Sequence, residues 1–130
     1  MQSNIAKAFG RTVLIGSGAI GTCLRGTVGI GDEPVELLNL RSPETVKNLH
    51  AAYRDAGSQI LVTNTFAANA LVLGEAGAAD RCDDVNRAGV ALAREAGGPE
   101  GLVWASVGPL GLGLRLEDYP DAALEEIYRR

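Results

Sequence analysis

Six residues near the start of the chain have the spacing of an anion-binding turn. Gly16, Gly18 and Gly21 form a GxGxxG pattern directly after Thr12–Ile15, an apolar run that predicts a buried strand. The backbone N–H groups of such a turn can converge on a carboxylate or a phosphate without help from a side chain. Small residues at Gly18 and Ala19 would also let a ligand approach the backbone closely. The pattern therefore suggests either a dinucleotide site or the capture of a smaller anion.

The residues that follow the turn argue against a dinucleotide site. A dinucleotide-binding unit continues with an uninterrupted helix and then a second strand that ends in an acidic residue. Here Gly26, Gly29 and Gly31 would interrupt that helix, at about 1 kcal/mol each relative to alanine. Asp32 and Glu33 fall in a loop instead of closing a strand. Besides anion capture, a plain glycine turn without any ligand stays open as an interpretation.

The rest of the sequence alternates between predicted helices and strands. A short helical piece is expected near Ile20–Arg25 within the glycine-rich loop. A second short helix is expected over 67–74. Longer helices are expected over about 43–56 and 83–96, a last helix opens at 118–121, and further strands are expected over 59–63 and 102–107. This order is typical of a parallel sheet with helical crossovers. Ligands of such a sheet bind at the carboxyl ends of its strands.

Several side chains are expected to support these helices. Ser42 is placed to cap the helix predicted over 43–56, and Asp83 or Asp84 is placed to cap the helix predicted over 83–96. Val46, Leu49, Tyr53 and Ala56 recur at helical spacing and predict one buried face. His50 lies on the same helix, far from the strand ends, so we expect a partly buried histidine with its hydrogen bonds satisfied.

The composition excludes several classes of protein. With 130 residues, 46% of them hydrophobic, the chain has the length and apolar content of one folded domain. A net charge of -4 argues against a nucleic-acid partner, which requires a basic surface. No apolar run is long enough for a membrane span, and none precedes Arg11 as a secretory signal would. We therefore expect a cytoplasmic protein.

Three residues with metal-binding side chains are too far apart to suggest a metal site. Cys23, His50 and Cys82 have no CxxC or HxxH spacing, and a zinc site needs three or four protein ligands. Two free, partly buried thiols are the expected state of the cysteines.

A colinear series of motifs resembles the homocysteine S-methyltransferase family, which includes the opening barrel of cobalamin-dependent methionine synthases. The resemblance covers about residues 12–128. It rests on the turn Ser17–Thr22, the stretch Pro34–Leu40, Pro43 with Glu44, His50 and Tyr53, the stretch Thr63–Phe66 with Asn69, and Val107–Pro109. Of these, the TNTF sequence together with the upstream series is the most specific.

The resemblance implies a fold, a reaction and a binding site. The fold would be α/β, the first half of a (β/α)8 TIM barrel over residues 1–130, and the reaction methyl transfer to the thiol of homocysteine or a related acceptor. The substrate-binding residues would be Ser17, Gly18 and Ala19 at the turn and Asn64 and Thr65 at a strand end. The family's zinc ion is held by three cysteines, and the methyl donor can be cobalamin on a partner domain. No catalytic or metal-binding residue is assigned to this chain.

Two departures from the family qualify what the resemblance implies. The family's turn begins with an aspartate that pairs with the substrate ammonium, whereas this chain has Ser17. The family's zinc cysteines lie in the second half of the barrel, so we expect this chain to be inactive without a zinc-bearing C-terminal half. The expected macromolecular partner is a second half-barrel or a second copy of the chain. The alternatives are a non-catalytic half-barrel that serves assembly and, with less support, a dinucleotide-binding domain.

Overall fold

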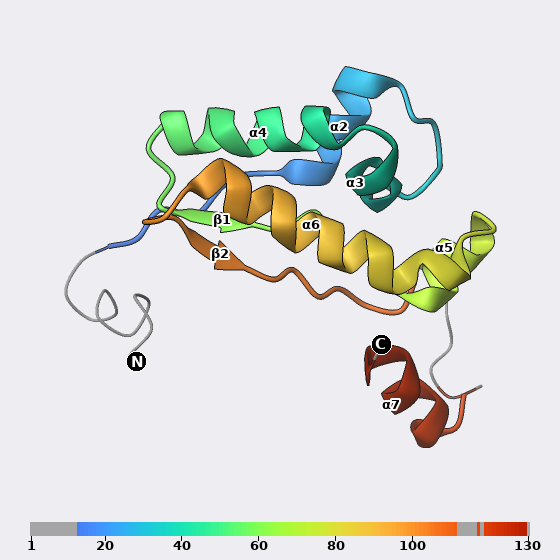
Figure 1. Cartoon of the computed structure of the whole chain (residues 1–130). Coiled ribbons are helices and arrows are strands. Elements are labelled where there is room, and N and C mark those ends of the chain that lie inside the picture. The colour runs from blue at the N-terminus through green and yellow to red at the C-terminus, as the bar shows by residue number, and fades with distance from the viewer. Residues whose placement is uncertain (1–12, 112–116, 118, 130) are drawn as a thin grey trace.

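The computed structural model describes residues 13–111, 117 and 119–129 as an α/β structure (Figure 1). The elements in chain order are α2 (Ile20–Val28), the 3-10 helix η1 (Val35–Leu37), α3 (Leu38–Arg41), α4 (Pro43–Asp55), β1 (Ile60–Val62), α5 (Ala70–Glu75), the 3-10 helix η2 (Ala79–Arg81), α6 (Cys82–Gly97), β2 (Leu102–Trp104) and α7 (Asp121–Arg129). Within the described ranges, none of the helices has the length and apolarity needed to cross a bilayer.

The two strands pair in parallel, as the sequence predicts. Ile60 aligns with Leu102 and Val62 with Trp104, and α5, η2 and α6 form the connection between the two strands (Figure 1). The strands are shorter than predicted. Beyond β2, the chain stays beside β1 through side-chain hydrogen bonds instead of a regular ladder.

The prediction of a strand over 12–15 was wrong, since residues 13–15, the part of it that the structure describes, form no regular strand. Gly16 forms a single parallel bridge with Ile60, and the Ile15 carbonyl accepts hydrogen bonds from the N–H groups of Gln59 and Ile60 at 2.8 and 3.1 Å. Ser17 N–H donates to the Ile60 carbonyl at 2.8 Å. Pairing is therefore confined to 15–17, too short a stretch for a regular ladder, and Thr12 lies outside the described residues.

Helices α4 and α6 lie side by side along the sheet and pack closely against each other (Figure 1). Leu61 of β1 packs against Ala93 and Ala96 of α6. On α4, Val46 is fully buried and Leu49 and Tyr53 are half-buried, as predicted. Ala56 is exposed because α4 ends at Asp55, so its place on the buried face was a wrong prediction.

The predicted helix caps differ from those in the structure. Ser42 does precede α4 with Pro43 in its first turn, but the Ser42 side chain makes no capping hydrogen bond. Helix α6 begins at Cys82 after Arg81, so Asp83 and Asp84 lie inside its first turn instead of capping it. The side chain of Asp84 accepts from Arg81 Nε at 3.0 Å.

Two further helix boundaries follow from local chemistry. The Asn69 side chain caps α5 by accepting from Leu71 N–H and Val72 N–H at 3.1 and 3.0 Å, which starts this helix later than predicted. Helix α2 continues through Gly26 and ends only before Gly29, whose φ of 63° favours glycine. Gly26 therefore does not break the helix, contrary to expectation.

The environment of His50 contradicts the prediction of a satisfied, partly buried histidine. Its side chain is fully buried, and neither ring nitrogen has a hydrogen-bond partner. Burial lowers the pKa of His50 below its ordinary value of 6.5. The folded chain therefore holds this imidazole in its neutral form, because a charge at this position would be desolvated.

His50 predicts a loss of stability in mild acid. The unfolded chain binds a proton at His50 below about pH 6.5, whereas the folded chain resists protonation, so stability falls as the pH decreases through this window. We expect the free energy of unfolding to fall from about pH 7 to about pH 5 with a contribution of up to about 1.4 kcal/mol per pH unit from this group. Urea titrations of the chain and of His50→Leu at several pH values measure it. Equal slopes in both proteins would contradict the assignment to His50.

Gly89 marks the closest approach between α6 and the end of β1. A Cβ atom at Gly89 would lie 2.7 Å from Asn39 Nδ2 and 2.7 Å from Thr65 Cγ2. We expect Gly89→Ala to lower the free energy of unfolding by about 1–3 kcal/mol, as overpacking does. Gly26→Ala is the matched control, since Gly26 is also helical but faces open space. We expect this control to stabilise the chain by about 0.5–1 kcal/mol in the same urea titrations.

Candidate functional site

The glycine turn is tied to β1 through Ser17. Its N–H donates to the Ile60 carbonyl at 2.8 Å, and its hydroxyl oxygen accepts from Val62 N–H at 3.0 Å. The Ser17 side chain therefore extends the pairing with β1 instead of projecting freely into solvent. Gly18 and Ala19, which follow, are both exposed, as a turn that meets a ligand through its backbone requires.

Tyr53 of α4 supports the turn from the other side. Its hydroxyl donates to the Ala19 carbonyl at 2.9 Å, and a Cβ atom at Gly18 would lie 3.0 Å from Tyr53 Cε1 and Oη. Cys23 Sγ lies 3.6 Å from the same hydroxyl. The hydrogen bond with Cys23, followed by partial burial, raises the pKa of Tyr53, so this hydroxyl remains a donor at neutral pH.

The Asn64 side chain is committed to a buried network. Its Nδ2 donates to the Val35 carbonyl at 3.0 Å and to Asn39 Oδ1 at 2.9 Å. Asn39 Nδ2 donates in return to the Asn64 carbonyl at 2.8 Å and to the Val85 carbonyl at 3.1 Å. Because these groups are buried, each would be costly to leave unpaired. Asn64 therefore fixes the end of β1 against η1, α3 and α6.

The Thr65 side chain lies on the other side of the strand end, toward β2. Its hydroxyl donates to the Ser106 carbonyl at 2.8 Å and contacts the Thr63 hydroxyl at 2.6 Å. Ser106 N–H completes the ring of hydrogen bonds by donating to Thr63 Oγ1 at 2.9 Å. This ring joins the chain after β1 to the chain after β2 where the backbone ladder has ended.

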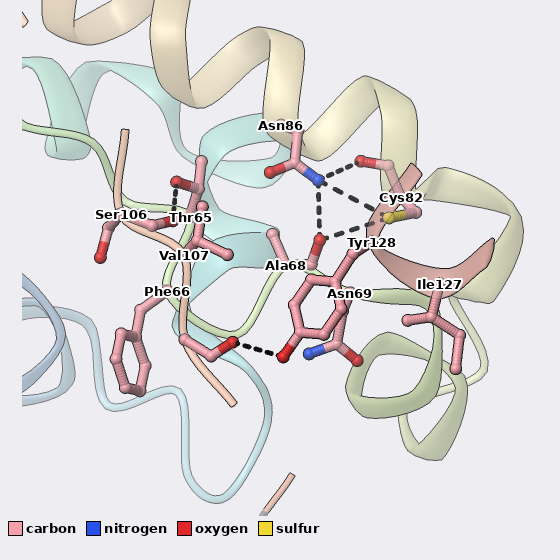
Figure 2. A pocket seen from close by; sticks show the side chains of 11 residues that line it. Thr65, Phe66, Ala68, Asn69, Cys82, Asn86, Ser106, Val107, Ile127 and Tyr128 are labelled. Atoms are coloured by element: carbon pink, nitrogen blue, oxygen red, sulfur yellow. Dashed lines mark hydrogen bonds between the residues drawn. The ribbon is translucent and has the colours of Figure 1, made fainter. Parts of the chain in front are cut away.

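A cavity of about 260 Å³ lies beyond this ring of hydrogen bonds (Figure 2). Thr65 and Ser106 form one wall, Cys82 and Asn86 a second, and Tyr128 of α7 a third. Asn86 Nδ2 donates to the Ala68 carbonyl at 2.7 Å, and the Cys82 thiol donates to the same carbonyl at 3.3 Å. The Tyr128 hydroxyl donates to the Gly108 carbonyl at 3.1 Å. The polar groups of this cavity are thus largely used by the fold.

The structure brings the two predicted substrate-binding segments to the same end of β1. Ser17–Ala19 lies along one edge of β1, and Asn64 and Thr65 follow its last residue. Asn64 faces the buried network and Thr65 faces the cavity, so the two side chains diverge. Their contact with a substrate stays a prediction.

Three buried polar residues that position this site, Asn39, Thr63 and Glu36, were not among the predicted site residues. Asn39 and Thr63 are buried and pair with the predicted residues. Glu36 is also buried, and its carboxylate accepts from Ala67 N–H at 3.0 Å. The available signal was polarity inside apolar surroundings, since Glu36 and Asn39 interrupt the run Val35–Leu40. Buried polar residues in such runs are expected to be hydrogen-bonded.

The residues present do not fit a zinc site. Across residues 13–111, 117 and 119–129, no three His, Cys, Asp or Glu side chains are grouped so that they could hold a metal ion. Cys23 is exposed on α2, whereas Cys82 is buried at the start of α6, and both are free thiols. We therefore assign no metal ligand to the described part of this chain and derive no step through a metal.

The described fold also gives the dinucleotide alternative no support. Helix α2 has 9 residues, and the segment after it forms η1 and α3. The second strand of a dinucleotide-binding unit, which would end in an acidic residue, is therefore replaced by helical turns in this segment.

Comparison with known proteins identifies the family. The family model described as Homocysteine S-methyltransferase matches residues 14–130. A methionine synthase of Mycobacterium tuberculosis is 32% identical over 124 residues, which is 83% of this chain and 10% of that protein. A methionine synthase of Mycobacterium leprae is 30% identical over 103 residues, which is 72% of this chain and 8% of that protein.

Solved structures share the fold. The metallated form of the homocysteine methyltransferase MmuM from Escherichia coli matches with a TM-score of 0.76 and 23% identity, over 98% of this chain and 51% of that one. The oxidized form matches with a TM-score of 0.77 and 22% identity, over 98% and 50%. The chain thus spans about a tenth of the curated relatives it matches and about half of the solved chains. On the family match over residues 14–130, the chain belongs to the homocysteine S-methyltransferase family.

Proposed function

We propose that this chain is the N-terminal half of a (β/α)8 barrel that transfers a methyl group to the thiol of homocysteine or a related acceptor. The observation that carries the proposal is the family match over residues 14–130. The names of the relatives support it, since they are methionine synthases and a homocysteine methyltransferase. The parallel β1–β2 pair with its helical connection is the repeating unit from which such a barrel is built.

In this proposal the glycine turn binds the carboxylate of the acceptor. Gly18 and Ala19 are exposed and lead directly into the N-terminus of α2, where N–H groups have no partner within the helix. The helix dipole adds a favourable interaction with a negative charge at this end. Thr65, which lines the cavity beside β2, is proposed to reach the acceptor from the end of β1, and Asn64 holds that strand end in place.

The zinc ion and the methyl donor are assigned to parts of the barrel outside the described residues. The family resemblance supports a zinc-bearing C-terminal half and, for some members, cobalamin on a partner domain. The small-molecule partner is therefore a thiol, and the macromolecular partner a second half-barrel. A cytoplasmic location stays a prediction from the sequence.

Exposed apolar residues along the sheet support a second candidate role, a non-catalytic half-barrel that serves assembly. Ile15 is 58% exposed, Trp104 41% and Val107 73%. Clusters of large exposed apolar side chains mark surfaces that bind another protein segment. Such a surface fits either role, and methyl transfer distinguishes them.

Reconstitution tests the methyltransferase proposal. The chain is combined with a zinc-bearing C-terminal half-barrel of the family, zinc, L-homocysteine and a methyl donor. We expect methionine to form, as measured by mass spectrometry, and neither half alone to produce it. A stable complex of the two halves without methyl transfer would contradict the enzyme and support the assembly role.

Ser17→Asp tests the recognition of the acceptor. An aspartate retains the oxygen that accepts from Val62 N–H and adds a negative charge for the substrate ammonium. A charge-assisted hydrogen bond contributes roughly 1.5–3 kcal/mol, compared with about 1 kcal/mol for a neutral one. We therefore expect about a tenfold gain in affinity for L-homocysteine by calorimetry. Binding of 4-mercaptobutyrate, which lacks the ammonium, is the control and should not strengthen.

A further inference from the structure

We propose that Tyr53 is a positioning residue for the glycine turn. Its hydroxyl orients the turn so that the first free N–H of α2 points toward the bound carboxylate. This inference rests on the proposed function for the identity of the ligand. Tyr53 lies on α4, outside the turn, and its sequence position gives no sign that it reaches the site. Its place between two clusters of the core makes it a rigid support, because its ring packs against both.

The hydrogen bond to Ala19 determines the orientation of one peptide group. Tyr53 Oη donates to the Ala19 carbonyl at 2.9 Å, and that carbonyl shares a peptide plane with Ile20 N–H. In a trans peptide the C=O and N–H groups point in opposite directions, and the described residues contain no cis peptide bond. The Ile20 N–H therefore points away from Tyr53. Ile20 is the first residue of α2, where an N–H has no partner within its own helix.

The fit between the Tyr53 ring and Gly18 limits the turn to one arrangement. A Cβ atom at Gly18 would lie 3.0 Å from both Cε1 and Oη of Tyr53. Any larger residue at 18 would push the ring away from the Ala19 carbonyl. Tyr53 thus occupies one side of the turn and leaves the opposite side, where Ile20 N–H points, for the ligand.

Cys23 of α2 lies beside the Tyr53 hydroxyl. Its Sγ lies 3.6 Å from Tyr53 Oη, so the thiol can donate to the hydroxyl oxygen while the hydroxyl donates to Ala19. This chain of donors runs from α2 back to the turn that precedes the same helix. It gives the exposed Cys23 a role that requires no metal and no redox chemistry.

The test compares Tyr53→Phe with the unchanged chain, because this variant keeps the ring and removes only the hydroxyl. In nitrogen-15 relaxation measurements without ligand, we expect the order parameter of the Ile20 amide to fall from about 0.85 to below about 0.6, as the peptide loses its fixed orientation. Gly18→Ala should produce the same change by displacing the ring. Tyr128→Phe is the matched control, since it removes a hydroxyl that donates to the Gly108 carbonyl, and it should leave Ile20 unchanged.

A titration with L-homocysteine adds the functional readout. We expect Tyr53→Phe to weaken binding about tenfold or more, the effect of one misplaced hydrogen bond to a charged group. An unchanged Ile20 order parameter in Tyr53→Phe, or unchanged affinity, would overturn the positioning role. If the unchanged chain does not bind homocysteine, the proposed ligand is wrong, and the Ile20 amide alone then decides whether Tyr53 orients the turn.

Discussion

The reciprocal pairing of Asn39 with Asn64 is the interaction on which the candidate site depends. Each side-chain amide donates to the other residue, and each also reaches a backbone carbonyl of a third element, Val35 or Val85. Removal of the Asn64 side chain would take away the donor to the buried Asn39 Oδ1, and an unpaired buried polar atom costs about 1–3 kcal/mol. The pair therefore joins η1, α3, α6 and the end of β1 into one unit. Gly89 is glycine because this unit leaves no room for a side chain on α6.

A strand end held in this way provides a fixed reference for the rest of the site. The glycine turn is positioned relative to β1 through Ser17, which bonds to Ile60 and Val62. The cavity beside β2 is positioned through the Thr63 and Thr65 hydroxyls. Both sides of β1 are thus fastened by side chains where the backbone ladder is too short to do so. The site depends on polar contacts that a helix or strand pattern does not encode.

Much of the fold could be predicted from the sequence because it depends on local chemistry. Glycine and proline mark most helix ends, and the apolar run before Thr63 identifies β1. Contacts between residues far apart in the sequence could not be predicted from such local signals. Nothing near His50 in the sequence shows that its ring is fully buried without a hydrogen-bond partner. The capping role expected of Asp84 was wrong because α6 begins at Cys82, which places Asp84 inside the first turn of the helix.

The part of the candidate site that consists of backbone, the glycine turn, could be predicted from the sequence. The spacing of Gly16, Gly18 and Gly21 places an exposed turn after a β segment, and the structure has one there. The residues that orient this turn come from elsewhere in the chain. Tyr53 was predicted to lie on the buried face of its helix, and the partner of its hydroxyl is set by how α4 packs against the turn. Only the tertiary structure supplies that information.

Polar and apolar side chains of the proposed half-barrel differ in how far the described residues cover them. The polar network around Asn39, Asn64 and Thr65 finds its hydrogen-bond partners among the described residues, so its geometry needs no other segment. By contrast, the apolar side chains of Ile15 and Trp104 are 58% and 41% exposed. Burial of apolar surface provides stability in proportion to area and with little directional preference, whereas hydrogen bonds fix orientation. Additional barrel units would therefore stabilise the sheet while leaving the orientation of the turn to Ser17 and Tyr53.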